Sequence, residues 1–437
     1  MNIKKSIISI LSGITVIGLL FSSCQKEESD TNKLKTYADT VNNINNQVHE
    51  VMRLNYLWYD SMPSVNHDNY NDPMKFIHAI ENWRDHWSFI LTNDEYQSQF
   101  VTGDYYGFGF ASGFDNEMKL RVAYVFKSSA LYKAGVTRGW TIKSINGVTP
   151  DTINFNSIFG ENEKISKVFS FTRTDGKDTT ISFTKKTITQ NTVLAYDTLH
   201  VNSKVVGYIS FLAFDLDADT ELQQAFTYFQ SNNVSELVLD LRYNGGGDLA
   251  ITQNLANMLG GSSAAGKTFV NLTFNNKNTK QNQSFAFQSS PNALNINRLF
   301  VISTNETASA SEVIINSLRG VDMPVILIGS HTNGKPVGMM QYKLNFNYYL
   351  YAINFKMTNA KGFGDYYGGL PVDKSETDDI THNFGDSREA CLAQALYYIQ
   401  NGNFKPTAKS AKITNYQSKI YVEKRLINFI TIGKKYQ

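Results

Sequence analysis

The chain has 437 residues, of which 42% are hydrophobic and 18% are charged, and its formal net charge is +2. This length is enough for two or three globular domains. The chain contains no long basic run, so it lacks the electrostatic footprint of a nucleic-acid-binding protein, and we expect no nucleic-acid partner. A high content of tyrosine, phenylalanine and asparagine favours strands and loops over long helices.

Residues 1–23 have the pattern of an export signal. Lys4 and Lys5 precede an apolar run from Ile7 to Phe21, which small and polar residues interrupt and which is too short for a convincing membrane span. Ser22-Ser23-Cys24 then resembles a lipoprotein cleavage site, which would leave Cys24 as the lipid-bearing first residue. That pattern prefers leucine where this chain has Phe21, so the alternative is an ordinary signal followed by a chance cysteine.

A lipid on Cys24 predicts a membrane-anchored protein of the cell envelope. We expect an outer-membrane lipoprotein that faces the periplasm or the cell surface, with the polar residues 24–40 as its tether. Cys391 is the other cysteine and lies in a predicted helix. Once Cys24 is acylated, no partner remains for Cys391, so we expect no disulfide.

Residues 41–98 are predicted to form a helical N-terminal domain. Apolar residues recur there at helical spacing, namely Val51, Leu54, Leu57 and Trp58, and then Phe76, Ile80 and Trp83. Trp58 and Trp87 could line a substrate channel, or they could simply pack this domain against the rest of the chain.

A glycine-containing motif opens residues 104–188. Gly107-Phe108-Gly109-Phe110 matches the carboxylate-binding loop of PDZ domains, in which backbone N–H groups converge on the terminal carboxylate of a peptide. Such a run alone also fits any bulged strand. The segment 128–148 supplies the helix, turn and strand that PDZ domains place next, although Trp140 stands where an acidic residue is usual. Residues 104–188 thus resemble a PDZ domain, which implies that Gly107, Phe108, Gly109 and Phe110 bind a polypeptide carboxy terminus.

Residues 192–402 alternate apolar runs with helical patterns. The runs at 205–214, 237–241, 299–302 and 325–328 predict buried strands, and the last predicted helix covers 387–399. Asn244 and three glycines follow the second run, but the Lys-Ser/Thr of a phosphate-binding loop is missing, so nucleotide binding is not indicated. Glycines between a strand and a helix instead let a backbone N–H point into a cleft.

Ser309-Ala310-Ser311-Glu312 opens a predicted helix directly after the third run, and Gly320 stands where a helix cap belongs. A serine at the positive end of a helix is placed to react, but its hydroxyl needs a base. No histidine stands in a motif, whereas Lys335 sits on a glycine loop after the next strand. Burial would lower the pKa of that lysine and suit it to the task. The alternative is that Ser309 and Ser311 are helix caps and Lys335 is a surface residue.

These motifs together resemble the C-terminal processing (tail-specific) serine peptidases. Ser309 matches the nucleophile of their S-A-S-E turn, and Lys335 matches the base of their G-K motif. The segment 237–244, LVLDLRYN, with the glycines after it matches their second motif, and the resemblance implies an oxyanion hole formed by the N–H groups of Gly246 and Ala310. YLWYDSMP (56–63) and DHWSFI (85–90) resemble the N-terminal cap of Bacteroidetes members.

The family commonly places a glutamine four residues after its lysine, to orient it. This chain has Met339 at that position, and its nearest glutamine is Gln341. A bulge at Met340-Gln341 would let Gln341 reach the lysine. Without such a bulge, the resemblance implies a Ser-Lys dyad alone.

The sequence therefore predicts a multi-domain α+β protein: a helical N-terminal region, a PDZ-like β domain, and a peptidase core of ββα repeats, as in crotonase-like folds. We expect a serine endopeptidase that acts on polypeptides with free carboxy termini and needs no metal or cofactor. The alternative is a catalytically inactive peptide- or ligand-binding surface lipoprotein on the same scaffold, because fold alone does not establish function. The extension 403–437 is basic and polar, and no function is assigned to it.

Overall fold

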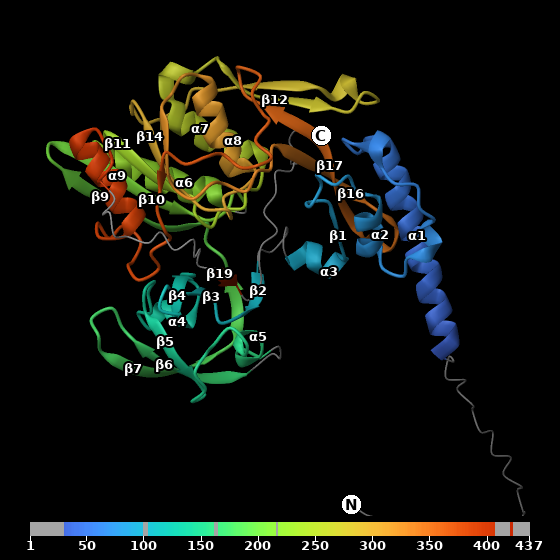
Figure 1. Cartoon of the computed structure of the whole chain (residues 1–437), viewed down its shortest axis with the longest axis horizontal. Coiled ribbons are helices and arrows are strands. Elements are labelled where there is room, and N and C mark those ends of the chain that lie inside the picture. The colour runs from blue at the N-terminus through green and yellow to red at the C-terminus, as the bar shows by residue number, and fades with distance from the viewer. Residues whose placement is uncertain (1–29, 99–103, 161–164, 216, 407–419, 423–437) are drawn as a thin grey trace, which may run out of the picture.

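The structure is a computed structural model that describes residues 30–98, 104–160, 165–215, 217–406 and 420–422. Three parts are visible: N-terminal helices beside a small sheet, a separate β domain, and a central α/β core (Figure 1). Within the described ranges, no helix combines the length and the apolar character needed to cross a membrane. The predicted export signal and Cys24 lie outside the described residues.

The N-terminal part is less helical than expected. Its elements are α1 (Asp30–Asn55), η1 (Tyr59–Ser61), η2 (His67–Asn69), α2 (Pro73–Ile80), β1 (Phe89–Leu91) and α3 (Asn93–Tyr96). Helix α1 begins inside residues 24–40, so this segment is helical from Asp30 onward, and its role as a tether stays a prediction. Ile44, Val48 and Met52 follow one another at four-residue spacing, and all three are buried.

Strand β1 joins the N-terminal part to an antiparallel sheet of the core. That sheet contains β1, β17 (Tyr349–Thr358), β12 (Thr268–Phe274), β13 (Gln283–Ala286) and β16 (Val337–Lys343). Ile90 of β1 pairs with Leu350 of β17. Helices α1 and α2 pack against this sheet, beside β16 and β17 (Figure 1). The N-terminal part therefore shares a hydrophobic cluster with the core instead of folding around one of its own.

Residues 104–189 form a β domain with an aromatic core. Its elements are β2 (Asp104–Gly107), β3 (Phe110–Phe114), β4 (Leu120–Val125), α4 (Ala130–Lys133), β5 (Thr141–Ile145), α5 (Phe155–Ile158), β6 (Ser166–Thr172), β7 (Asp178–Thr184) and β8 (Lys186–Thr189). The main sheet has the order β19-β3-β4-β5-β6-β7, in which β19 is Ile420–Val422. Phe108, Phe169 and Phe171 are among its buried rings. A compact β unit at 104–188 is thus where the sequence predicts one.

A mostly parallel sheet forms the central core. Its order is β18 (Lys374–Ser375), β15 (Val325–Gly329), β14 (Leu299–Ser303), β11 (Glu236–Asp240), β10 (Lys204–Phe211) and β9 (Val193–Val201). Only the β9–β10 pair is antiparallel. The helices are α6 (Ala218–Ser231), α7 (Leu249–Ala264), α8 (Ala310–Gly320) and α9 (Ala390–Asn401), and the short turns are η4 (Thr279–Gln281) and η5 (Asn345–Asn347).

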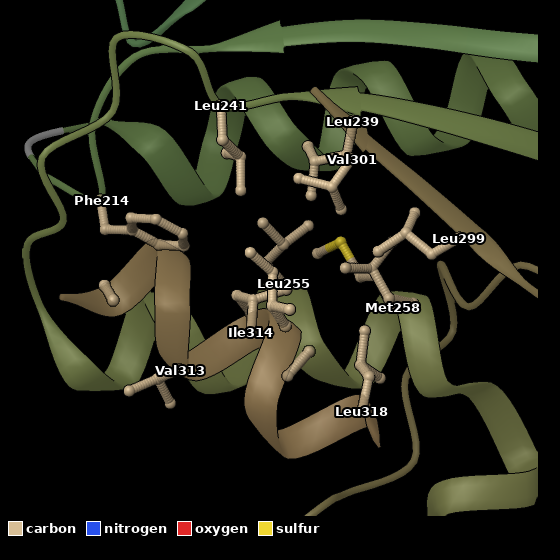
Figure 2. Close-up of a cluster of buried hydrophobic side chains, with 14 of the residues drawn as sticks. Phe214, Leu239, Leu241, Leu255, Met258, Leu299, Val301, Val313, Ile314 and Leu318 are labelled. Atoms are coloured by element: carbon tan, nitrogen blue, oxygen red, sulfur yellow. The ribbon is translucent and has the colours of Figure 1, made fainter. Parts of the chain in front are cut away.

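Both faces of this sheet are covered, which explains why its strands read as continuous apolar runs. Leu299 and Val301 of β14 pack with α7 and α8, as Figure 2 shows for the cluster around Ile314 and Leu318. Phe300 and Ile302, the alternate residues, face α9. The predicted strands and helices of the core are confirmed, and the mixed α/β multi-domain class is correct. The ββα-repeat description stays a prediction.

The role expected of Gly320 needs a correction. Helix α8 includes Gly320, and Asp322 (φ 66°) adopts the left-handed conformation that closes the helix. The N–H of Met323 bonds to the carbonyl of Leu318 across this turn. A Cβ atom at Gly320 would lie 2.8 Å from Cβ of Asn359, so packing is what requires glycine at that position.

A buried ion cluster joins the β domain to the core. Arg138 of the β domain contacts Asp378 of the core at 2.7 Å, and Arg242, next to the glycine run, contacts the same Asp378 oxygen at 2.6 Å. Tyr243 accepts a hydrogen bond from Arg138 and donates one to Asp378. Burial disfavours the charged carboxylate, but the two arginines keep the pKa of Asp378 below its usual value.

We predict that Asp378→Asn destabilises the fold by about 3 kcal/mol, because it leaves the buried Arg138 without a carboxylate partner. Chemical denaturation measures the change. The matched control is Asp386→Asn, which removes a carboxylate whose partner Arg388 is largely exposed. This surface change should have a much smaller effect. Equal losses in the two variants would contradict a structural role for the cluster.

Candidate active site

Ser309 lies at the turn between β14 and α8, as the sequence predicts. Its backbone has φ 58° and ψ −112°, a conformation that non-glycine residues seldom adopt. The residue is fully buried, and Ala310 begins the helix directly after it. A strained backbone persists only where its surroundings hold it in place. The contacts of this turn therefore determine whether Ser309 keeps its conformation.

The carboxylate of Glu312 provides the strongest of these contacts. One oxygen, Oε2, accepts hydrogen bonds from the backbone N–H groups of Ser309 and Lys335, both at 2.8 Å. The other, Oε1, accepts from the Thr332 hydroxyl at 2.6 Å and from the Gly334 N–H at 2.7 Å. A single carboxylate thus joins the serine turn to the lysine loop.

Burial and hydrogen bonding act on Glu312 in opposite directions. The side chain is completely buried, and desolvation raises the pKa of Glu312 above its usual value. The four donors counter this effect, since each of them favours the charged carboxylate. The donors also explain how an acidic residue is accommodated in the core.

Lys335 is buried between the core and the N-terminal part. Its relative exposure is 0%, and loss of hydration lowers the pKa of Lys335 well below its usual value. The charges of Asp85 and Glu312 oppose that shift. Nζ of Lys335 lies 5.8 Å from the ring centroid of Trp87. The lysine is therefore not a surface residue, and Trp87 is beside it.

Asp85 holds the turn that carries Trp87. It accepts hydrogen bonds from the N–H groups of Trp87 and Ser88 and from the Ser88 hydroxyl, the last at 2.6 Å. The Ser88 hydroxyl in turn accepts a bond from the N–H of Ile353 in β17. The DHWS turn of the N-terminal part is thereby fixed to the core next to Lys335.

The glycine run lies against the serine turn. A Cβ atom at Gly246 would be 2.9 Å from Cβ of Ser309 and 3.0 Å from the nitrogen of Ala310, so only glycine allows this approach. The N–H of Gly246 donates to Oδ1 of Asn244, and the Ser311 hydroxyl donates to the Asn244 carbonyl. The structure thus brings Gly246, Ser309 and Ala310 together, with the Gly246 N–H engaged inside its own loop.

Gln341 is placed less favourably. Gln341 and its neighbour Met340 pair regularly with β17, and the register irregularity lies nearer the start of β16, between Gly338 and Met339. Oε1 of Gln341 accepts a hydrogen bond from the Tyr351 hydroxyl at 2.9 Å. The bulge on which an orienting role depends is missing at Met340-Gln341, and the role itself stays a prediction.

The Gly107–Phe110 segment connects β2 to β3, at one end of the β-domain sheet. Gly109 has φ 83°, and a Cβ atom there would collide with Ser129 and Ile188. Packing of the β domain alone therefore demands this glycine. The structure confirms the strand after the loop and leaves carboxylate binding as a prediction. Cys391 is a buried free thiol, while Cys24 lies outside the described residues.

Glu312 and Asp85 are part of the site but were not predicted from the sequence. Glu312 was visible as the last letter of the S-A-S-E turn, whose spacing is that of a capping box. Its second set of partners, on the lysine loop, has no local sequence signal. Asp85 lay in a recognised phrase, but nothing in that phrase indicates that it folds back on a lysine 250 residues later.

Comparison with family models agrees with this arrangement of parts. The model of peptidase family S41 matches residues 205–364, and the model of the peptidase S41 N-terminal domain matches residues 43–89. Two separate parts of the chain are thus similar to peptidase family S41. The first match contains Ser309, Lys335 and the glycine run, and the second contains the Asp85 turn.

Curated proteins similar to this chain are named as proteases of the same kind. It is 28% identical over 265 residues to a carboxyl-terminal-processing protease of Picosynechococcus sp., covering 59% of this chain and 61% of that protein. It is also 28% identical over 270 residues to a probable CtpA-like serine protease of Staphylococcus aureus, covering 59% and 50%. The chain thus matches only about half to three-fifths of the length of these relatives.

A solved structure resembles most of this chain. A candidate S41 protease from Bacteroides fragilis NCTC 9343 superposes with a TM-score of 0.69 at 25% sequence identity. The match covers 82% of this chain and 97% of that one. The resemblance to C-terminal processing peptidases is therefore confirmed at the level of the family.

We predict that Glu312→Gln lowers stability by about 1–3 kcal/mol, because an amide NH₂ would face donors that now bind a carboxylate oxygen. Denaturant unfolding monitored by tryptophan fluorescence measures the change. Glu117→Gln is the matched control, since Glu117 is largely exposed and pairs with Lys119 at the surface. A Glu312→Gln variant as stable as its control would show that the carboxylate does not hold the turn.

Proposed function

We propose that this protein is a serine endopeptidase in which Ser309 is the nucleophile and Lys335 is the general base. The observation that carries the proposal is the Glu312 carboxylate, one oxygen of which binds the backbone of both residues. The burial of Lys335 supports it, because a lysine serves as a base near neutral pH only when its pKa is depressed.

In the proposed reaction, Lys335 accepts the proton of the Ser309 hydroxyl as the oxygen attacks the peptide carbonyl. The protonated lysine then gives that proton to the leaving amine, and an acyl-enzyme remains. Water hydrolyses the ester, with Lys335 again as base. Trp87 and the Asp85 turn cover the lysine on one side and keep its surroundings poor in water, which sustains the depressed pKa of Lys335.

The developing oxyanion needs N–H donors, and Ala310 and Gly246 are proposed for this role. Gly246 approaches Ala310 closely, which favours the pairing. Its N–H now donates to Asn244, so we propose that the substrate oxygen replaces Asn244 Oδ1 as the acceptor. Gln341 stays proposed as the residue that orients Lys335, and its Oε1 accepts a hydrogen bond from Tyr351.

We further propose that the β domain captures substrates by their free carboxy termini, at Gly107–Phe110 and the edge of β3. Support comes from the order of loop and strand, which suits β-strand addition of a peptide. The Arg138–Asp378–Arg242 cluster supports it as well, since it holds the β domain next to the glycine run. Lipid attachment at Cys24, and with it a place in the outer membrane facing the periplasm or the cell surface, belongs to the same proposal.

An inactive binding protein on the same scaffold is the weaker alternative. It gives no reason for a buried lysine, a strained serine and a carboxylate that joins them. An active dyad accounts for all three features.

Ser309→Ala and Lys335→Ala should each lower the rate of peptide hydrolysis by about 10³-fold or more, and the double variant should be no worse than either single one. Cleavage of an unstructured polypeptide, followed by mass spectrometry, measures this. Ser317→Ala, which alters another buried serine of α8, and Lys343→Ala on the exposed end of β16 are the controls and should retain activity. Substantial turnover by Ser309→Ala would refute the assignment.

The pH dependence tests the base. Activity should rise with pH through the depressed pKa of Lys335 and then level off, because only the neutral amine accepts a proton. Asp85→Asn removes a negative charge that favours protonated Lys335, so the rising limb of kcat/KM should move to lower pH. The measurement is kcat/KM across pH for both forms.

Asp68→Asn is the control for this profile, because Asp68 is more than half exposed and belongs to η2. The rising limb of kcat/KM against pH for Asp68→Asn should coincide with that of the parent protein. A general loss of activity by Asp85→Asn without any displacement of the limb would assign Asp85 a packing role alone.

A further inference from the structure

The edge of β3 is already occupied by another part of the chain. On one side β3 pairs with β4, and on the other it pairs with β19, from the extension that the sequence analysis left without a function. The pairing is antiparallel, with Ile420 opposite Gly113, Tyr421 opposite Ser112 and Val422 opposite Ala111. All five residues of β3 are buried.

The direction of β19 is the informative feature. As the chain proceeds from Ile420 to Val422, its partners move from Gly113 back to Ala111, toward the Gly107–Phe110 loop. A peptide that adds to β3 with its carboxy terminus at this loop must run in the same direction. Strand β19 therefore has the edge and the polarity of a bound carboxy-terminal segment. The sequence continues to Gln437, however, so β19 brings no terminal carboxylate to the loop.

We infer that β19 is a tethered competitor of the substrate for the β3 edge. This inference rests on the proposed capture of carboxy termini and adds its regulation. A polypeptide with a free carboxylate displaces β19, because it offers the same backbone pairing together with a charge for the loop. The ligand class is an extended peptide with a free α-carboxylate, and the occupant in its absence is residues 420–422 of this chain.

Displacement of β19 by a free peptide should cost little free energy. A segment tethered on the same chain competes at an effective concentration of about millimolar, so it weakens the binding of a free peptide without any new contact. Three paired residues form a short strand, and short terminal pairings open at low free-energy cost. We therefore expect partial occlusion, with apparent peptide affinity reduced by about tenfold in the full chain.

The test compares the full chain with a chain that ends at residue 419. A fluorescent peptide with a free carboxy terminus, and the same peptide with an amidated terminus, are titrated into both. Loss of β19 should tighten binding of the free-terminus peptide by about tenfold. A synthetic peptide of residues 417–425 with an amidated terminus, added in trans at millimolar concentration, should reverse the gain.

Two further variants separate the strand from the rest of the extension. A chain that ends at residue 430 keeps β19 and places its new terminal carboxylate eight residues beyond Val422, so it should bind like the full chain. The full-length double variant Tyr421→Pro, Val422→Pro should bind like the chain that ends at 419, because proline cannot donate a ladder hydrogen bond.

The possible results test competition by β19 separately from the proposed capture of carboxy termini. If both chains prefer the free terminus with equal affinity, capture stands and the competition by β19 is overturned. If neither chain distinguishes free from amidated peptide, capture by this edge is overturned, and the inference falls with it. Cleavage by Ser309, measured separately on an unstructured polypeptide, bears on the dyad alone.

Discussion

The structure of the site depends on one buried carboxylate. Glu312 accepts four hydrogen bonds, from the serine turn on one side and from the Thr332–Lys335 loop on the other. Without it, the positive-φ backbone of Ser309 and the lysine loop would each need another source of restraint. Charge-assisted bonds to backbone N–H groups are strong and directional, so they fix backbone positions more tightly than apolar packing does.

A second constraint fixes the β domain relative to the glycine run of the core. Arg138 belongs to the β domain, and Asp378 lies in the segment of the core that follows β18. Arg242 lies in the segment that leads into the glycine run. Tyr243, the next residue, bonds to both Arg138 and Asp378. Any rotation of the β domain against the core must therefore strain or break contacts two residues or fewer from Asn244. The position of the Gly246 N–H is mechanically coupled to the β domain in this way.

The sequence predicts the core well because its signals are local. Continuous apolar runs such as 299–302 and 325–328 specify strands buried on both faces, and Ser309 and Lys335 stand directly after two of these strands. The parts that could not be predicted depend on contacts between distant residues. Asp85 reaches Lys335 only because β1 pairs with β17, and no local pattern encodes that pairing. Local composition also did not predict the regular register at Gln341 or the helix that begins at Asp30.

The pairing of β1 with β17 has a consequence for the order in which the molecule assembles. Ser88 and Ile353, which join these two regions, are 265 residues apart in the chain. Contacts between such distant residues form late, because closing the loop costs entropy before any contact compensates for it. During synthesis the N-terminal helices are made before β17. Their apolar faces cannot be buried against β17 until that strand has been made. The Asp85–Trp87 turn is fixed beside Lys335 through β17, so this covering of the lysine requires β17 to be in place.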